Sequence, residues 1–401
     1  MRILYLTDIR FPLERANGIQ TVETCYALAE RGHTVVLLVR PDTQRPRRDP
    51  FEFYGLAPCA RLIVRTTVVF GSPVMRRVAY LAQAVIAVAT AIPGGVDVVI
   101  TRDLGVASAV LRLPRRVRPP LVYESHGFSP ALAEAMPNLA TGAAAASPSK
   151  IRRLLGRERR VWRDAEGYIA ISNGLTADLI ERLGTRDALM AVADGLRLDP
   201  QRRFVPPRRQ RSPVVAFAGH LYPNRGVDVL LRALALLPDV RGLIIGGHPA
   251  EADLVRLQTM ARELGIDDRV TFTGLVQRNH VPTLLEQADV LLMPYVKTLI
   301  TERYASPLKL FEYMGLGKPI VGSDLPAVRE ILQDGENARL VEPGDPDALA
   351  AGIRQVLDDG DFAERIARRA FEQAPAYSWE RRAERIETLL DRVVSGEGRE
   401  T

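Results

Sequence analysis

The sequence predicts an α/β protein built from two consecutive open parallel sheets of the Rossmann-like kind. Short apolar runs rich in Val, Ile and Leu alternate with helical patterns, which is typical of parallel sheets covered by helices. This alternation begins at residue 2 and starts afresh at residue 213. A length of 401 residues fits two domains better than one. We expect the two domains to face each other across a cleft that holds the active site.

The composition indicates a globular protein that needs no metal. Hydrophobic residues make up 47% of the chain and charged residues 25%, and the net charge of +6 suits anionic ligands or an anionic membrane surface. Cys25, Cys59 and the five histidines show no spacing of metal ligands. The longest apolar run, Val78 to Ile92, is shorter than the ~20 residues that span a bilayer. With no signal peptide in the first residues, we expect a cytoplasmic location, with peripheral contact at the inner face of the membrane as a further possibility.

The first domain opens with a strand, a helix and a second parallel strand. Arg2 to Thr7 and Thr34 to Val39 are the predicted strands, and the helical pattern begins at Ile19. Gly18 follows a polar loop that lacks the dinucleotide motif G-x-G-x-x-G. Contact of Gly18 with a ligand and a role in a tight turn are equally expected.

A polar cluster follows a later strand of the same domain. Leu121 to Tyr123 is a buried strand that runs directly into Glu124-Ser125-His126. Because open α/β sheets bind ligands at the carboxyl ends of their strands, His126 is a candidate for substrate contact or proton transfer. The alternative is a histidine that only stabilises the loop.

A strongly basic helix is predicted over residues 150–163. It carries seven Lys and Arg residues beside an apolar side that contains Trp162. Most runs of this kind are solvated faces. The alternative is contact with an anionic acceptor or with membrane lipids.

A Pro- and Arg-rich segment, Arg202 to Ser212, is a predicted linker. It divides the chain into an acceptor-binding domain, residues 1–205, and a donor-binding domain, residues 206–377. The last helix, within residues 378–401, is expected to pack back on the first domain.

The helix that follows Ser306 is a predicted phosphate site. Ser306 is a suitable N-cap and Pro307 a suitable first helical residue, and Leu308 begins an apolar stripe at helical spacing. The free N–H groups and the positive end of the helix dipole, with Lys309 beside them, favour an anion. Glu312, one turn further, can accept hydrogen bonds from sugar hydroxyls. Together they suit the diphosphate and ribose of a nucleotide; a capped helix with solvated Lys and Glu is the competing interpretation.

Four segments of the second half, in this order and spacing, resemble the retaining GT-B glycosyltransferases of the family 4 type (glycosyl transferases group 1). They are Ala218 to Asp228, Val270 to Gly274, Ala288 to Pro294 and Ser306 to Ser323. The N-terminal half agrees more loosely, through Gly18, His126, Ser172 and Asp194-Gly195. The run Ser306-Pro-Leu-Lys-Leu-Phe-Glu-Tyr-Met314 is similar to a subgroup of this family.

The resemblance implies a role for each matching residue. Gly219, His220 and Arg225 stand where the family has a loop with an Arg and a Lys that hold the donor diphosphate, and His220 departs from that pattern. The segment Phe272, Thr273 and Gly274 is expected to meet the nucleobase, and Glu312 the ribose. A second departure is Tyr304, at the position of a family acid associated with the donor sugar; Glu302 could replace that acid.

The resemblance further implies a hexosyltransferase-type enzyme (EC 2.4) that moves a sugar from a nucleotide-diphosphate sugar to an acceptor hydroxyl with retention. The acceptor would be a saccharide, a lipid-linked sugar or a small molecule, in bacterial polysaccharide or glycoconjugate assembly, with no cofactor, metal or nucleic acid involved. Catalytic roles fall to His126, Arg225, Lys309 and Glu312. Donor binding falls to Gly18, Gly219, His220, Arg225, Phe272, Thr273, Gly274, Tyr304, Ser306, Pro307, Leu308, Lys309 and Glu312. The alternatives are a nucleotide-sugar epimerase of the same fold and a non-catalytic nucleotide-sugar-binding subunit.

Overall fold

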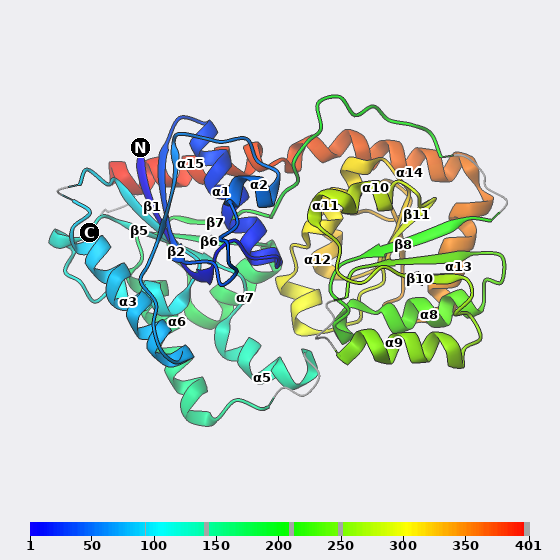
Figure 1. The fold of residues 1–401 in the computed structure, drawn as a ribbon, viewed down its shortest axis with the longest axis horizontal. Coiled ribbons are helices and arrows are strands. Elements are labelled where there is room, and N and C mark those ends of the chain that lie inside the picture. Colours follow the sequence, from blue (N-terminus) through cyan, green and yellow to red (C-terminus); the bar gives the residue numbers. More distant parts are fainter. Residues whose placement is uncertain (93, 140–143, 208–211, 248–251, 397–401) are drawn as a thin grey trace. The chain divides into compact units, whose positions relative to one another are not determined.

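Two compact units make up the chain in the computed structural model, which describes residues 1–401 except 93, 140–143, 208–211, 248–251 and 397–401 (Figure 1). Unit 1 comprises Met1–Ala131, Ser147–Asp194 and the C-terminal segment from Trp379. Unit 2 comprises Leu132–Ala146 and Gly195–Ser378. Each unit is an open α/β sheet with helices on both faces, so the predicted fold class is confirmed.

The sheet of unit 1 has seven parallel strands in the order β3-β2-β1-β4-β5-β6-β7. The strand order reverses between β1 and β4, which makes their carboxyl ends the expected ligand edge. The strands are β1 (Arg2–Arg10), β2 (Thr34–Arg40), β3 (Leu62–Thr66), β4 (Val98–Thr101), β5 (Leu121–Ser125), β6 (Gly167–Ala170) and β7 (Leu189–Ala191).

The helices of unit 1 form two layers. On one face α1 packs against the last helix, α15, and on the other α4 packs between α3 and α6. The helices are α1 (Ala16–Glu30), α2 (Pro50–Tyr54), α3 (Pro73–Ala89), α4 (Leu104–Val110), α6 (Pro148–Asp164), α7 (Asn173–Leu183) and α15 (Trp379–Ser395), with a 3₁₀ turn at Arg115–Val117. A further helix, α5 (Ser129–Leu139), begins at the end of one segment of unit 1.

The sheet of unit 2 has six parallel strands in the order β10-β9-β8-β11-β12-β13. Here the order reverses between β8 and β11. The strands are β8 (Val214–Ala218), β9 (Arg241–Ile245), β10 (Val270–Phe272), β11 (Val290–Met293), β12 (Ile320–Ser323) and β13 (Arg339–Val341).

The helices of unit 2 include the predicted phosphate-binding helix, α11. They are α8 (Val227–Ala235), α9 (Ala252–Glu263), α10 (Val281–Leu285), α11 (Leu308–Leu316), α12 (Pro326–Arg329), α13 (Pro346–Asp358) and α14 (Gly360–Gln373). Short turns lie at Pro223–Arg225, Arg278–His280, Ile300–Tyr304 and Ala374–Tyr377. Among the described residues no helix is both long and apolar enough to cross a membrane.

Residues 195–205, which the linker position assigned to the first domain, lie with unit 2. The N–H of Leu196 donates to the carbonyl oxygen of Tyr377, and the ring of Phe204 packs against that of Phe371 at 5.9 Å. These apolar and backbone contacts hold the segment against α14 and the turn that follows it. Part of the predicted linker, residues 208–211, lies outside the described residues.

Candidate active site

The loops after β8 and β11 bring aromatic and basic side chains together at the ligand edge of unit 2. The ammonium nitrogen of Lys309, on α11, lies 3.6 Å from the centre of the Phe217 ring and 5.4 Å from that of Tyr295. Arg225 also lies over Tyr295, with its guanidinium carbon 4.8 Å from the ring centre. Phe217 is the penultimate residue of β8 and Tyr295 follows β11, so two neighbouring strands position both cations.

Among the described residues, the charge on Lys309 is only partly balanced. Its stem is partly exposed, but its nitrogen is buried and has no hydrogen-bond partner among the described residues. Burial, and then the charge of Arg225, hold the pKa of Lys309 well below its ordinary value, while Glu312 acts in the opposite direction. Two cations held this closely favour an anionic ligand that restores the charge of Lys309.

Two glycines allow this close approach. A Cβ at Gly219, whose φ is +137°, would lie 2.7 Å from the Lys309 nitrogen. At Gly226, with φ +67°, a Cβ would lie 1.7 Å from the carbonyl oxygen of Pro294. Only glycine fits there, and Arg225 is the residue just before it.

The helix α11 begins one residue later than predicted. Leu308 is its first residue and Pro307, with extended backbone, is the residue before it, so Ser306 is not the N-cap. Proline supplies no N–H and no side-chain oxygen, so Pro307 provides no side-chain cap for this helix. The predicted apolar stripe is confirmed, because Leu308, Phe311 and Met314 are buried.

Glu312 forms an ion pair that the sequence did not predict. Its carboxylate accepts a hydrogen bond of 2.9 Å from Arg278, which lies in the short turn before α10. Both side chains remain about one-third exposed, so the pair is accessible. Arg278 therefore orients Glu312 or competes with a ligand for it.

Tyr304, at the position of the missing family acid, and Glu302, two residues upstream, have different surroundings. Tyr304 is only 2% exposed and ends the turn Ile300–Tyr304. Glu302 lies in the same turn and pairs with Lys297 at 3.5 Å.

The segment at the end of β10 lies against the loop after β9. The N–H of Gly246 donates to the hydroxyl of Thr273 at 3.2 Å, and Gly246 forms a bridge with Gly274. Phe272 and Thr273 are partly exposed. His220 stacks on Tyr222 with ring centres 5.1 Å apart, so the tyrosine ring fixes the orientation of the histidine ring.

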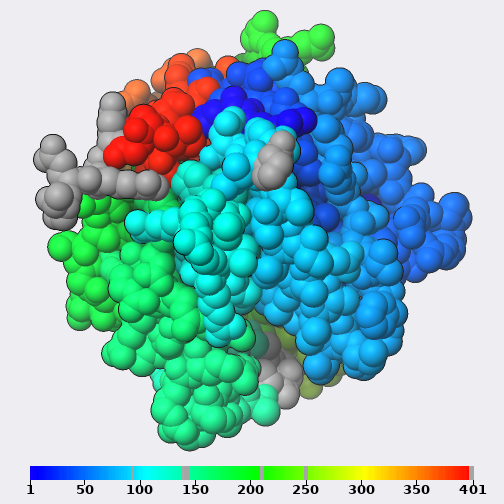
Figure 2. All heavy atoms as spheres, turned by 90° about the vertical axis from the view of Figure 1, so that its left-hand side faces the viewer, coloured from blue at the N-terminus to red at the C-terminus, as the bar shows by residue number. Residues whose placement is uncertain are grey.

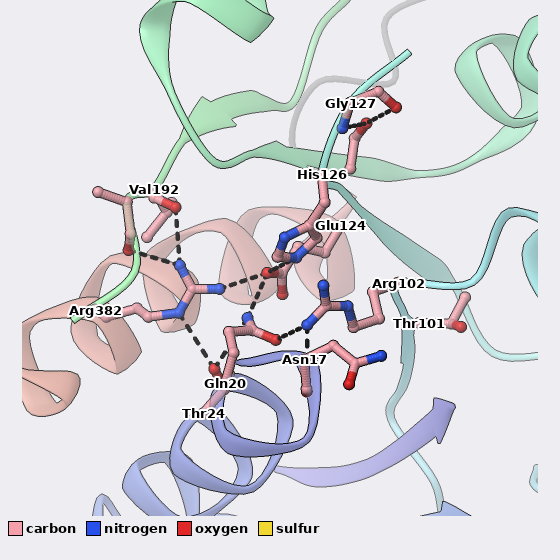
Figure 3. A network of polar contacts seen from close by, with 12 residues as sticks. Asn17, Gln20, Thr24, Thr101, Arg102, Glu124, His126, Gly127, Val192 and Arg382 are labelled. Carbon is pink, nitrogen blue, oxygen red and sulfur yellow. Dashed lines mark hydrogen bonds and ion pairs between the residues drawn. The ribbon is translucent and has the colours of Figure 1, made fainter. Parts of the chain in front are cut away.

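In unit 1, His126 is part of a buried polar network (Figure 3). Its Nε2 lies 2.8 Å from the carboxylate of Glu124, which also accepts from Gln20 at 2.5 Å and from Arg382 at 2.7 Å. Arg102 donates to the side-chain oxygen of Gln20 at 2.6 Å. Residues from α1 and α15 thus meet at the carboxylate of Glu124 on β5, and Arg102 of the loop after β4 joins the network through Gln20.

The network keeps His126 neutral. Burial lowers the pKa of His126 to about 4, and the charge of Arg102 adds to this, against the hydrogen bond to Glu124. Although burial disfavours its ionisation, the charge of Arg382 and the hydrogen bond from His126 hold the pKa of Glu124 well below its ordinary value. With the N–H at Nε2 donated to Glu124, Nδ1 of His126 is available as an acceptor.

Gly18 lies within the first turn of α1 and not in the loop before it. The helix begins at Ala16 after Arg15, which offers no side-chain cap. A Cβ at Gly18 would lie 2.5 Å from the carbonyl oxygen of Leu13 and 2.8 Å from the Tyr54 hydroxyl. Close packing of the chain is therefore the role that the structure gives to this glycine.

Sequence reasoning missed several residues of both sites. Phe217 and Tyr295 adjoin motifs that had been identified, and a search for aromatic residues beside those motifs would have found them. Arg278, Gln20, Arg102 and Arg382 carry no local pattern, because each reaches its partner only through the fold.

Two family models match the chain and together span most of it. One described as "Glycosyltransferase Family 4" matches residues 18–195, and one described as "Glycosyl transferases group 1" matches residues 212–359. They correspond to the two sheets described above.

Relatives and solved structures agree with these matches. The chain is 31% identical over 210 residues to a D-inositol 3-phosphate glycosyltransferase of Mycolicibacterium gilvum; this covers 51% of the chain but only 43% of the relative. Sucrose-phosphate synthase from Thermosynechococcus elongatus shares the fold with a TM-score of 0.78 and 19% identity, covering 99% of this chain and 100% of that one. Anabaena HepE in complex with UDP-glucose has a TM-score of 0.72 and 19% identity, covering 98% and 99%.

The chain has the GT-B fold, and each of its two sheets lies within a segment that matches a model of glycosyltransferases.

Proposed function

We propose that the protein transfers a sugar, of hexosyl type, from a nucleotide-diphosphate sugar to an acceptor hydroxyl with retention of anomeric configuration. The observation that carries this proposal is the pair of cations at the ligand edge of unit 2. Lys309 has a buried nitrogen without a hydrogen-bond partner among the described residues, and Arg225 shares the Tyr295 ring with it. A diphosphate would supply the missing negative charge.

The proposed mechanism is stabilisation of the departing diphosphate. As the bond between the anomeric carbon and the diphosphate oxygen breaks, negative charge grows on the phosphates. Arg225, Lys309 and the free N–H groups at the start of α11 would receive that charge without a metal or another cofactor. The guanidinium of Arg225 can donate two parallel hydrogen bonds to phosphate oxygens, and Lys309 acts as a point charge.

Further donor contacts are proposed for residues of unit 2 and for His126 of unit 1. Glu312 would accept hydrogen bonds from the ribose, and Phe272, Thr273 and Gly274 would meet the base. His126 would contact the transferred sugar through its free Nδ1, held in that state by Glu124. The D-inositol 3-phosphate glycosyltransferase relative and the UDP-glucose complex of HepE support a nucleotide sugar as donor.

The acceptor is a saccharide, a lipid-linked sugar or a small molecule, in bacterial polysaccharide or glycoconjugate assembly on the cytoplasmic side of the membrane. We propose no nucleic-acid partner. The basic helix α6 is proposed as a contact with anionic membrane.

The test is release of nucleoside diphosphate from UDP-, GDP- and ADP-sugars, measured with and without a panel of acceptors and without added metal. Product linkage by NMR reports retention or inversion. Acceptor-dependent release supports the transferase; an isomerised or free sugar formed equally without acceptor indicates an epimerase, and donor binding without turnover indicates a binding subunit. Lys309→Ala and Arg225→Ala should each lower turnover by about 10²–10³, whereas Lys318→Ala, a lysine just after α11, should not.

A further inference from the structure

The helix α3 of unit 1 is apolar on two opposite faces. Tyr80, Ala84 and Val88 are buried against the sheet. On the other side Val78 is 60% exposed and Ile86 61% exposed, in a stripe at helical spacing. An ordinary surface helix would carry polar residues there.

The exposed stripe continues into the loop before the helix. Val68 is 69% exposed and Phe70 57% exposed. Gln83 of α3 holds this loop by accepting from the N–H of Val68 and donating to its carbonyl oxygen, both at 2.8 Å. Loop and helix therefore form one apolar surface, which also includes Val74 and Met75.

The segment that forms this surface carries Arg residues but no Asp or Glu, although Arg77 is ion-paired with Asp8 and Asp103 of neighbouring elements. No Asp or Glu occurs between Glu52 and Asp97, a stretch that contains Arg61, Arg65, Arg76 and Arg77. On the same face of the sheet, α4 packs between α3 and α6, and the guanidinium of Arg157 of α6 lies near Arg77 and interacts with it electrostatically.

Several basic residues of α6 are exposed, whereas one of its two acids is buried and the other, Asp164, pairs with Arg163. Lys150, Arg152 and Arg153 are exposed, while Glu158 is buried and accepts from the N–H of Ser129. The blue-to-cyan and green-cyan atoms of these parts of unit 1 lie on the face that Figure 2 shows.

We propose that the apolar surface of α3 and its preceding loop docks onto a bilayer that contains anionic lipid, with the exposed basic residues of α6 contacting the headgroups. The helix is too short and too closely packed on its inner face to span the membrane, so it lies along the interface. Charge complementarity decides between possible occupants. A symmetric contact between two copies would bring the same basic residues together, whereas anionic headgroups neutralise them. This inference does not depend on the nature of the donor.

The test is co-sedimentation of the full chain with vesicles of phosphatidylcholine alone and of phosphatidylcholine mixed equally with phosphatidylglycerol. We expect binding to the mixed vesicles only, weakened by salt. The double variant Val78→Glu with Ile86→Glu should lower the partition coefficient at least about tenfold, because two apolar contacts are lost and two like charges to the lipid are gained. The matched control is Leu236→Glu with Val255→Glu, two apolar residues of unit 2 that are 51% and 63% exposed, and it should bind as wild type does.

The role of the basic residues of α6 is tested by the double variant Arg152→Glu with Arg153→Glu. It should lower binding to the mixed vesicles about tenfold or more, whereas the control Arg232→Glu, in unit 2, should not. Circular dichroism and nucleotide binding establish that each variant is folded, and Val78→Ser with Ile86→Ser is the milder replacement if the Glu variant fails. Binding that these changes leave unaltered, or that is equal on both vesicle types, overturns the proposal. It is also overturned if no vesicle is bound and sedimentation velocity shows a dimer that Val78→Glu dissociates.

Discussion

The ammonium nitrogen of Lys309 lies 3.6 Å from the centre of the Phe217 ring, and no hydrogen-bond acceptor among the described residues reaches it. The ring face is electron-rich and partly stabilises the cation, but it does not replace an anion. These side chains therefore form a site for a negatively charged group at the carboxyl end of β8. The proposed diphosphate would fill it.

Nucleotide binding should take up protons. Because burial and Arg225 depress the pKa of Lys309, some of the lysine is neutral in the free protein at high pH, and a bound diphosphate raises that pKa again. Affinity should thus fall as pH rises above the pKa of the free lysine. Calorimetric titration in buffers of different ionisation enthalpy measures the proton count, and Lys309→Met should reduce it. A proton count that the substitution does not change would contradict this coupling.

Gly226→Ala should lower the free energy of unfolding by more than the cost of placing alanine at a positive φ. Alanine at positive φ costs about 1 kcal/mol, and the contact with the Pro294 carbonyl oxygen adds to it, for a loss of about 3 kcal/mol or more. Gly344→Ala is the matched control, because its φ is +79° and a Cβ there meets open space. Urea unfolding of both variants gives the comparison; equal losses would mean that the loop moves aside without cost.

Glu312 and Arg278 should differ in their effect on nucleotide affinity. If Glu312 binds ribose, Glu312→Gln weakens nucleotide binding about tenfold, whereas the free base binds as before. Arg278→Met removes only the 2.9 Å pair, so its effect should be smaller. The measurement is the nucleotide dissociation constant of each variant. The same loss of affinity in both variants would show that the ion pair, and not a contact of Glu312 with ribose, supports binding.

His126 should make unit 1 less stable as pH falls. Its pKa is about 4 in the folded protein and near its ordinary 6.5 when unfolded, so the unfolded chain binds more protons between these values. The stabilisation of the fold by neutral His126 is fully present above pH 6.5. It is lost as pH falls towards 4, and the loss reaches up to about 3 kcal/mol.

Asp194 has the opposite effect on the pH dependence of stability. Burial raises its pKa to about 6, so its ionisation destabilises the fold as pH rises. The measurement is therefore a difference: the free energy of unfolding of wild type minus that of His126→Gln, from urea titrations at pH 4.5 and 7. We expect this difference to shrink at the lower pH. A difference that stays constant would show that His126 does not titrate within the network. The variant should also lower turnover without changing nucleotide affinity.

The sequence was sufficient for the two α/β units and for the position of Lys309, because both depend on local patterns. Apolar runs of strand length and glycines after strands mark the sheets, and a proline at a helix start marks α11. The start of α1 was placed too late, because Arg15 precedes it without a capping side chain. Arg278 and Arg382 reach Glu312 and Glu124 from 34 and 258 residues away, so only the tertiary fold brings them together.

The central claim is that Lys309 and Arg225 hold the diphosphate of a nucleotide sugar. Calorimetric titration of wild type, Lys309→Met and Lys318→Met with UDP, GDP and ADP, without added metal, tests it most directly. We predict that wild type and Lys318→Met bind one of the three nucleotides and that Lys309→Met binds it at least about tenfold more weakly. Equal affinity of the Lys309 variant, or no binding of any nucleotide by the wild type, would contradict the claim.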